Sequence, residues 1–505
     1  MRYSFVRCLT GVVALGVPLI ANAGSFAINE QSVSGLGTAY AGGAAQAEDA
    51  STLFFNPAGI VLLDQGELQL GAHGLFTSAT FSNEGSRYHL PGTPFNGLPL
   101  TGGNDGDAGV THALPNLYLS QPVLRGSPYG ELSLGIGLTV PFGLETDYSP
   151  GWVGRYQALR TKLTTFDIQP TAAYRIHDRF SFGVGLDIQY VSARITQAID
   201  FGLASQQPLA QFFGALPPFL VGPTQAAYLN AGFFPGGRDG VSEVEGDDWA
   251  VGFTLGALWE YMKGDEQSFV QDGRFGVSFR SAIDHTIEGS AEFRRVPLIN
   301  APGAPVQFPI PGLFRGIFFN QDATAQLDLP SILHISAYQR FDRQFALMGD
   351  ITWTEWSRLQ QVPIVFSSPR TAPSILQIQY DDSIRASAGL EWYACKNFTA
   401  RFGVAYDETP IRSDEFRTPR IPDNDRVFLG TGFRWSPAHY MDIDVGYAHL
   451  FVRDPGVDTI DNQGHELRGK FDASVDIVSA AVTFRWGGPR EITPVSGKDV
   501  LSYKK

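Results

Sequence analysis

The sequence predicts an all-β fold, a closed antiparallel barrel of fourteen transmembrane strands with an N-terminal segment inside its lumen. Three observations support this prediction. Apolar residues alternate with small or polar ones along most of the chain, which is strand geometry because successive side chains point to opposite faces. The connections between the alternating segments are alternately long and short, and a secretory signal precedes them all.

Composition agrees with such a barrel. The 505 residues include 56 glycines and 12% aromatic residues, and only 17% are charged, which is low for a soluble protein of this size. After the signal, no run of about 18 apolar residues exists that could form a spanning helix. The formal charge of −14 argues against binding nucleic acid through net charge. With one of the two cysteines, Cys8, inside the signal, Cys395 has no partner for an internal disulfide.

Residues 1–23 have the organisation of a signal peptide. Arg2 and Arg7 form a positive start, residues 9–20 form a short apolar core, and Ala21-Asn22-Ala23 is a cleavage site. An uncleaved anchor is the alternative, but the apolar core is too short to span a bilayer.

Residues 24–65 precede the first strand and are rich in Gly, Ala and Ser. Their small residues at 34–43 could pack closely against other backbone. A disordered leader and an inserted plug, or hatch, are both conceivable. The apolar anchors favour the hatch, because a disordered leader needs none; they are Phe26, Ile28, Leu53, Phe54, Phe55 and Ile60.

Residues 66–486 carry the predicted strands. In 129–141, for example, Leu132, Leu134 and Ile136 alternate with Ser133 and Gly135. A polar face of this kind cannot be half of a dry core, so we expect lipid outside and a lumen inside. The predicted strands are 66–81, 109–121, 129–141, 161–175, 179–194, 247–262, 273–294, 321–340, 344–358, 374–394, 398–409, 424–435, 439–453 and 472–486.

The connections set the orientation. Long ones follow the odd-numbered strands and short ones follow the even-numbered strands, as in a barrel with external loops and periplasmic turns. Both chain ends are then periplasmic. Trp486 ends the last strand near the membrane interface, and residues 487–505 form a polar periplasmic tail without a fold of its own.

Two long external loops, 195–246 and 295–320, are unusually apolar. Such loops must bury against each other or against a hydrophobic ligand, since a large exposed apolar patch usually marks a binding site. The two interpretations are compatible, because a crevice between packed loops is itself a landing site. The expected groove residues are Phe212, Phe213, Leu216, Phe219, Leu220, Phe308, Ile310, Leu313, Phe314 and Phe318.

At this point the chain resembles the FadL-type family of outer-membrane long-chain fatty acid transporters. The resemblance covers essentially the whole mature chain, and its departures are the tail after Trp486 and the long loop insertions. The strongest sequence matches to the family are the small-residue stretch 34–42, Ala47-Glu-Asp-Ala50 and the Asn56-Pro57-Ala58 motif. Weaker matches are Ser278-Phe-Arg-Ser281, Trp353-Thr-Glu-Trp-Ser357 and Ile421-Pro-Asp-Asn-Asp-Arg426.

The resemblance implies a fourteen-stranded barrel occluded by a hatch, a groove between the third and fourth long loops, and a kink in strand three. Gly135 and Gly137 would permit such a kink, although they could equally leave room for the hatch. Asn56, Pro57 and Ala58 form a rigid turn that could serve as a gate or be an ordinary turn.

Three inward-pointing arginines, Arg385, Arg401 and Arg426, could hold a ligand carboxylate in a partly dry pocket. Alternatively they pair with acids of the lumen, such as Asp350, Asp381, Asp442 or Asp444.

The expected function is passive transport of long-chain fatty acids or similar hydrophobic molecules across the outer membrane of a Gram-negative bacterium, through a groove, a pocket and a lateral exit. Aromatic hydrocarbons, or export of oxidised fatty acids, are alternatives within this class, and a general porin is an alternative of another class. We expect a monomer surrounded by lipid and lipopolysaccharide, with no nucleic acid partner.

No enzyme activity, cofactor or metal is expected, because the histidines show no metal-ligand spacing and no nucleophile elbow occurs. Gly464–Lys470 matches most of a phosphate-binding loop, but Phe471 replaces the required Ser or Thr.

Overall fold

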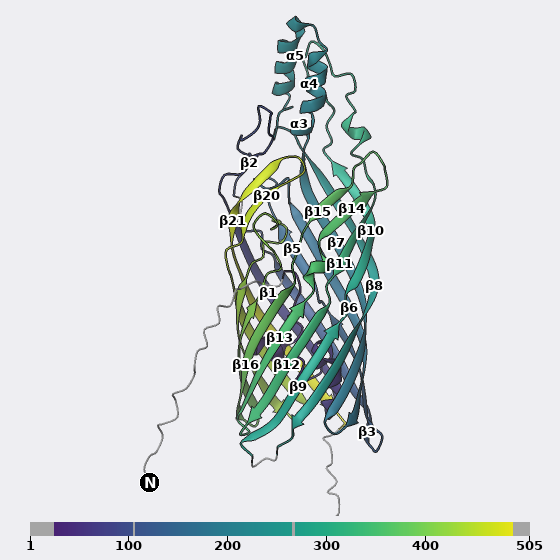
Figure 1. Cartoon of the computed structure of the whole chain (residues 1–505), viewed down its shortest axis with the longest axis vertical. Helices are drawn as coiled ribbons and strands as arrows, with labels where there is room; N and C mark the ends of the chain where they lie inside the picture. The colour runs from purple at the N-terminus through teal and green to yellow at the C-terminus, as the bar shows by residue number, and fades with distance from the viewer. Residues whose placement is uncertain (1–24, 105–106, 265–267, 488–505) are drawn as a thin grey trace, which may run out of the picture.

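The computed structural model describes residues 25–104, 107–264 and 268–487. Within this part of the chain, fourteen strands close into an antiparallel barrel, as predicted (Figure 1). The predicted signal peptide and nearly all of the predicted tail lie outside the described residues. The wall strands are β1 (Gly66–Asn83), β3 (Thr111–Ser127), β4 (Gly130–Thr139), β6 (Arg160–His177), β7 (Phe180–Asp200), β8 (Asp239–Met262), β9 (Val270–Arg280), β12 (Ile332–Phe341), β13 (Phe345–Thr354), β16 (Ser383–Cys395), β17 (Phe398–Asp407), β18 (Arg426–Ala438), β19 (Met441–Val452) and β21 (His465–Trp486).

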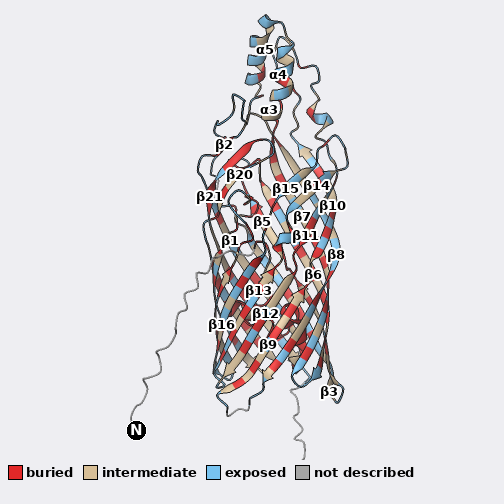
Figure 2. Cartoon of the chain, viewed as in Figure 1, coloured by how far each residue is buried: buried red, intermediate tan, exposed pale blue. Residues whose placement is uncertain are grey.

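The first and last wall strands close the barrel. β1 and β21 pair without interruption from Gly66 opposite Trp486 to Asn83 opposite Gly469. Burial alternates along the wall strands, so buried and exposed residues follow one another in Figure 2. On β18, Leu429 and Trp435 are exposed while Phe428 is buried. This alternation is what a wall between lipid and a filled lumen requires.

Aromatic pairs mark the two edges of an apolar band on the outer face. Near the short turns, the rings of Phe180 and Trp259 lie 6.0 Å apart, and further up the same two strands the rings of Tyr190 and Trp249 lie 5.2 Å apart. Ten residues of a tilted strand rise about 25 Å, which is the height of the apolar band in membrane barrels. Among the described residues, no helix is long and apolar enough to cross a membrane.

Above this band the wall continues into shorter strands that form its upper rim: β2 (Arg87–Tyr88), β5 (Gly143–Asp147), β10 (Ile283–Arg294), β11 (Gln321–Leu329), β14 (Gln361–Phe366), β15 (Ser374–Gln377) and β20 (Gly456–Ile460). β10, β11 and β15 lie within segments that the sequence predicts as single strands, whereas β2, β5, β14 and β20 lie in predicted loops. The segment 321–340 breaks after β11 because Pro330 has no N–H to donate and the chain changes its neighbour from β10 to β9. The segments 273–294, 344–358 and 374–394 are likewise interrupted.

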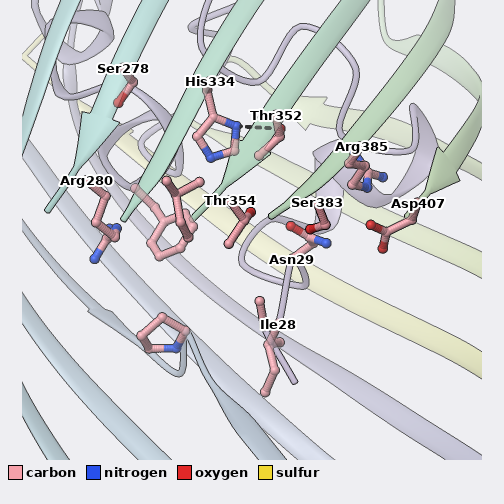
Figure 3. Close-up of a pocket in the computed structure, with 14 residues that line it drawn as sticks. Ile28, Asn29, Ser278, Arg280, His334, Thr352, Thr354, Ser383, Arg385 and Asp407 are labelled. Atoms are coloured by element: carbon pink, nitrogen blue, oxygen red, sulfur yellow. Dashed lines mark hydrogen bonds between the residues drawn. The ribbon is translucent and has the colours of Figure 1, made fainter. Parts of the chain in front are cut away.

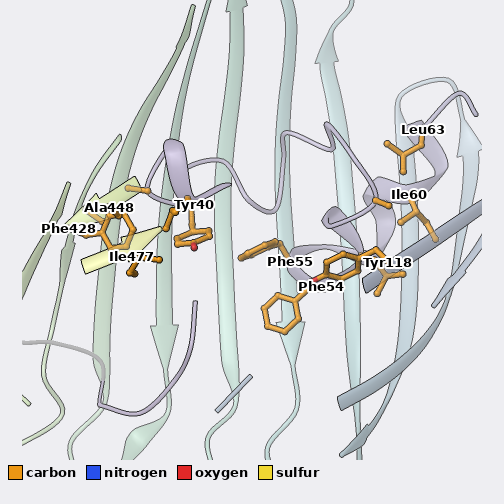
Figure 4. Packing of buried hydrophobic residues seen from close by; sticks show 14 of the residues in the cluster. Tyr40, Phe54, Phe55, Ile60, Leu63, Tyr118, Phe428, Ala448 and Ile477 are labelled. Atoms are coloured by element: carbon orange, nitrogen blue, oxygen red, sulfur yellow. The ribbon is translucent and has the colours of Figure 1, made fainter. Parts of the chain in front are cut away.

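The N-terminal segment lies inside the barrel. It contains the short helices α1 (Val33–Gly37), α2 (Thr52–Phe55) and η1 (Pro57–Leu62). Its apolar side chains pack against inward residues of the wall, with Phe54 and Ile60 near Tyr118, and Tyr40 near Phe428 (Figure 4). Nearly every residue from 30 to 62 is buried or half-buried, so the apolar anchors occupy the lumen as expected for a hatch.

Two long loops form a tower above the rim (Figure 1). The loop between β7 and β8 contains three helices, α3 (Phe201–Ala204), α4 (Gln206–Gly214) and α5 (Pro218–Asn230), and the loop between β10 and β11 contains the turn η2 (Phe314–Gly316). A further short turn, η3 (Trp356–Arg358), follows β13 at the mouth of the barrel. The tower therefore lies above the rim, and the hatch is a separate structure inside the lumen.

Candidate functional site

The Asn-Pro-Ala motif anchors the hatch to one wall. The Asn56 side chain caps η1 by accepting from the Ala58 N–H at 3.0 Å, and it donates to the carbonyls of Ala44 at 2.7 Å and Ala257 at 3.0 Å. The motif lies on two paired glycines of β7 and β8. A Cβ atom at Gly183 would be 2.3 Å from the Ala58 nitrogen, and one at Gly256 would be 2.0 Å from Asn56 Oδ1. Only glycine fits beneath this turn.

A buried ion-pair cluster holds the hatch to the opposite wall. Arg434 of β18 contacts both hatch acids, Glu48 at 2.8 Å and Asp49 at 2.7 Å. Arg401 of β17 contacts Glu48 at 2.6 Å and two acids of the wall, Glu391 at 2.8 Å and Asp444 at 2.7 Å. The guanidinium groups are thus surrounded by carboxylates, and their role here is to bind the hatch to the barrel.

The three candidate head-group arginines therefore differ. Arg401 is saturated by acids, and Arg426 pairs with Asp407 at 2.7 Å. Arg385 donates to the Ala39 carbonyl at 2.8 Å, and among the described residues it makes no ion pair with a carboxylate. Its guanidinium lines a cavity (Figure 3). Of the three arginines, Arg385 alone lines this cavity.

The cavity beside Arg385 is polar and has an empty volume of about 620 Å³, its opening included. Figure 3 shows His334 and Thr352 within it, joined by a hydrogen bond of 2.9 Å. Its floor and sides come from five wall strands and from the hatch. The lining residues are Ala27, Ile28, Asn29, Phe54, Pro141, Ser278, Arg280, Ile332, His334, Thr352, Thr354, Ser383, Arg385 and Asp407.

A second cavity lies in the rim of the barrel and is apolar. Its empty volume is about 780 Å³, and its lining includes Leu163, Ile195, Val362 and Ile378. Phe26 lines this cavity, while the next residues of the hatch line the polar one. The first described residues of the hatch thus separate an apolar compartment from a polar compartment.

The start of the hatch is held by the mouth of the barrel. The Ser25 N–H donates to Asp423 Oδ2 at 2.8 Å, and its hydroxyl donates to Tyr380 at 3.1 Å. Asp423 lies in the loop between β17 and β18. Burial raises the pKa of Asp423 to about 6, because removal from water disfavours the charged carboxylate.

The third wall strand, which consists of β4 and its continuation β5 and is called strand three, is broken where the hatch touches it. β4 ends at Thr139 and β5 begins at Gly143, with Pro141 between them. The hatch supplies the missing hydrogen bonds. The Ile28 N–H donates to the Pro141 carbonyl at 2.9 Å, and the Gly143 N–H donates to the Phe26 carbonyl at 3.1 Å. The Gln31 side chain donates to the Val140 carbonyl at 2.7 Å.

The break leaves a gap in the strand pairing, here called the side opening, between residues 111–116 of β3 and β5. Below it, β3 and β4 pair up to Leu117 opposite Leu138. Above that point residues 111–116 pair only with β1 among the described strands. Pro115 lies in this stretch and has no N–H to offer a partner, which suits an edge strand. Two prolines in alternating segments, Pro115 and Pro141, are the sequence signal that could have located this opening.

The glycines considered for a kink lie lower on the strand. Gly135 and Gly137 pair regularly with both β3 and β6. A Cβ atom at either position would come within 2.9 Å of Leu53 in the hatch. Their observed role is to leave room for the hatch, and the interruption itself lies at 140–142.

The apolar loops pack against each other in the tower. The rings of Phe212 and Phe308 lie 5.5 Å apart, and those of Phe201 and Phe314 lie 5.0 Å apart. Phe219 and Ile310 remain exposed, at 76% and 56%. The remaining predicted groove residues are half-buried or buried between the loops, so the tower has both a packed interior and exposed apolar side chains.

A plugged barrel with an apolar upper cavity and an opening in its side is the architecture of a membrane channel for hydrophobic molecules. The family described as outer membrane protein transport protein (OMPP1/FadL/TodX) matches residues 14–486, so the chain belongs to this family. It is therefore an outer-membrane protein of a transport-channel family, not of an enzyme family, and it transports hydrophobic molecules.

Relatives and solved structures agree. The long-chain fatty acid transport protein of Escherichia coli O6:H1 is 29% identical over 87% of this chain and 90% of its own length. The structure of a Pseudomonas aeruginosa FadL homologue is 23% identical, with a TM-score of 0.73 over 92% of this chain and all of that one. The Ralstonia pickettii toluene transporter TbuX is 17% identical, with a TM-score of 0.56 over 87% and 94%. At these identities the two structures support the fold alone.

Proposed function

We propose that the protein carries long-chain fatty acids, or amphiphiles of the same build, passively across the outer membrane. One observation supports this choice within the family: an apolar cavity adjoins a polar cavity that contains Arg385. A molecule with an alkyl tail and an acidic head matches this pair of compartments. Asn56, Pro57 and Ala58 would hold the hatch in place while its start moves.

The driving force for loading is burial of the tail. Each methylene removed from water contributes about 0.8 kcal/mol, so a chain of apolar surfaces can draw the ligand inward without an energy source. The exposed residues of the tower, among them Phe219 and Ile310, would make the first contact. The crevice between the two loops would then pass the ligand to the apolar cavity.

The head group would be held by Arg385. A carboxylate in this cavity would gain a charge-assisted hydrogen bond in partly dry surroundings. Residues 26–31 stand between the two cavities and also complete strand three. Their displacement would join the cavities and open the side of the barrel, so the ligand would leave into the outer leaflet.

We further propose that one chain, surrounded by lipid and lipopolysaccharide, carries out the whole process.

The test compares palmitic acid with hexadecanol, which has the same tail and an uncharged head. We expect Arg385→Gln to weaken binding of the acid by about 10–100-fold, the value of a charged hydrogen bond, and to leave hexadecanol binding unchanged. Arg468→Gln in the exposed rim is the matched control. Equal losses for acid and alcohol would contradict a head-group role for Arg385.

The alternatives predict different outcomes in the same preparation. A carrier of aromatic hydrocarbons would bind toluene and ignore both long-chain ligands. A general porin would pass ions and sugars freely in a planar bilayer. Proteoliposomes loaded with an oxidised fatty acid on one side would distinguish export from import.

A further inference from the structure

One carboxylate, Glu145 of β5, is buried at the edge of the side opening. Glu145 lies opposite Lys162 of β6 in the strand register, so both side chains start from the outer face of the wall. Lys162 Nζ contacts Glu145 at 2.9 Å and Arg160 contacts it at 2.6 Å. The Glu145 side chain is only 4% exposed, although the two cations are more than 40% exposed.

His112 of β3 covers Glu145 from the other side. Its Nε2 atom lies 3.7 Å from the Glu145 carboxylate. His112 is opposite Leu75 in the β1 register, and Leu75 packs against the lumen cluster, so His112 starts from the inner face of β3. β5 is therefore displaced inward behind β3, and Glu145 bridges three strands across the opening.

The cations lie at the height of lipid head groups. Phe166 pairs with Tyr190 of the upper aromatic edge. Lys162 precedes Phe166 by four residues in the sequence and lies further out on β6. Arg160, Lys162 and Arg194 line a hollow on the outer face, with Thr164 and Ser192. A ligand whose tail had entered the outer leaflet through the opening would present its head group at this level.

We propose that Arg160 and Lys162 form an exit site for the carboxylate of the transported amphiphile. Glu145 occupies this site in the resting protein and thereby keeps the opening closed. The ligand carboxylate displaces Glu145, which frees β5 from His112 while the tail enters the leaflet. Because one carboxylate replaces another at the same two cations, the exchange is nearly balanced in energy and the ligand is not trapped. This inference rests on the proposed transport of acidic amphiphiles.

The experiment measures release from protein reconstituted in nanodiscs and loaded with a fluorescent C16 acid or the corresponding C16 alcohol, with a quencher in the lipid. The double variant Arg160→Gln/Lys162→Gln removes the partners of Glu145 and so loosens the closure for both ligands, and alcohol release measures that common effect. Relative to the alcohol, release of the acid is expected to slow by about 10-fold or more, the loss of a charged hydrogen bond. Arg468→Gln is the control, because Arg468 pairs with Asp458 and does not line the hollow. This variant is expected to release both ligands at the wild-type rate.

A second variant tests the closure. His112→Ala leaves the two cations intact and is expected to accelerate release of acid and alcohol alike. Glu145→Gln removes the carboxylate that occupies the exit site. In the Arg385→Gln background it is expected to restore acid binding and to leave alcohol binding unchanged.

The outcomes separate the two proposals. A wild-type protein that binds no acid overturns the proposed function. A wild-type protein that binds the acid normally, while the double variant releases acid and alcohol at unchanged or equally altered rates, overturns only the exit site. Unchanged alcohol release from His112→Ala overturns the closure.

Discussion

The hatch is held by two walls of the barrel in different ways. Towards β17 and β18, two acids of the hatch contact two buried arginines, and the strands there pair without a break. Towards β4 and β5, residues 26–28 of the hatch form backbone hydrogen bonds with a strand that is interrupted at 140–142.

The difference identifies which contact can change. Separating the acids from Arg401 and Arg434 would leave several charges buried and unpaired, which is strongly unfavourable. Releasing residues 26–31 from strand three exchanges a few neutral hydrogen bonds for bonds to water, each worth about 1 kcal/mol. The arginine wall is therefore the fixed attachment, and the broken strand is the movable one.

The largest expected effect comes from the fixed attachment. Arg434→Gln leaves Asp49 without a cation and leaves Glu48 and Asp444 with Arg401 alone. We therefore expect a loss of about 3–5 kcal/mol in the free energy of unfolding. Urea unfolding measures the loss, and ion conductance in a planar bilayer is expected to rise as the hatch loosens. Arg468→Gln, half-exposed in the rim, should change stability by less than about 1 kcal/mol. If Arg434→Gln behaved like this control, packing rather than charge would hold the hatch.

The movable contact should respond locally. Gln31→Ala removes the bond to the Val140 carbonyl and the bond that the Val140 N–H donates to Gln31 at 3.3 Å. We expect a local cost of about 1–3 kcal/mol, seen as faster amide hydrogen exchange in residues 139–143 with β18 unchanged. Exchange that increased equally in β18 would mean that the two walls are not independent.

The start of the hatch should depend on pH through Asp423. Its pKa is raised to about 6, so its contribution to stability is greatest below pH 4 and is lost as the pH rises through 6. Asp423→Asn keeps an acceptor for the Ser25 N–H and cannot ionise. We expect this variant to be more stable than the wild type by about 1–3 kcal/mol at pH 7.5, with the difference vanishing near pH 4. A difference independent of pH would assign the effect to packing.

The smallest effect on stability is expected in the tower, which contacts neither wall of the hatch. Phe219 is 76% exposed, so Phe219→Ser should change the free energy of unfolding by less than about 0.5 kcal/mol. The initial rate of palmitate uptake should nevertheless fall, because an apolar landing residue is lost. Phe308→Ala inside the tower is the contrasting variant, with an expected cost of about 3 kcal/mol.

Much of the wall was predictable because its signal is local. Alternation in segments such as 424–435 reports which side chains face lipid, and the short turns limit which strands can be neighbours. The apolar anchors of residues 24–65 likewise predicted a hatch in the lumen. The helices of the tower were not predicted, because α5 contains Pro223 and α4 is short, so neither shows a long amphipathic period.

The site was less predictable because its contacts join distant parts of the chain. Arg385, Arg401 and Arg426 are equivalent in sequence as inward arginines. Their roles differ because Glu48, Glu391 and Asp444 surround Arg401, Asp407 pairs with Arg426, and the hatch presents only a carbonyl to Arg385. The break in strand three depends on residues 26–31, more than a hundred positions away.

By itself, the sequence predicted a barrel with lipid outside, because a two-residue period repeats over many strands, the connections alternate between long and short, and a secretory signal precedes them. The tertiary structure decided where that barrel opens and which cation stays available. Those properties depend on which acids, carbonyls and prolines come into contact when the hatch fills the lumen. Contacts between residues so distant in the sequence are not encoded by a local pattern.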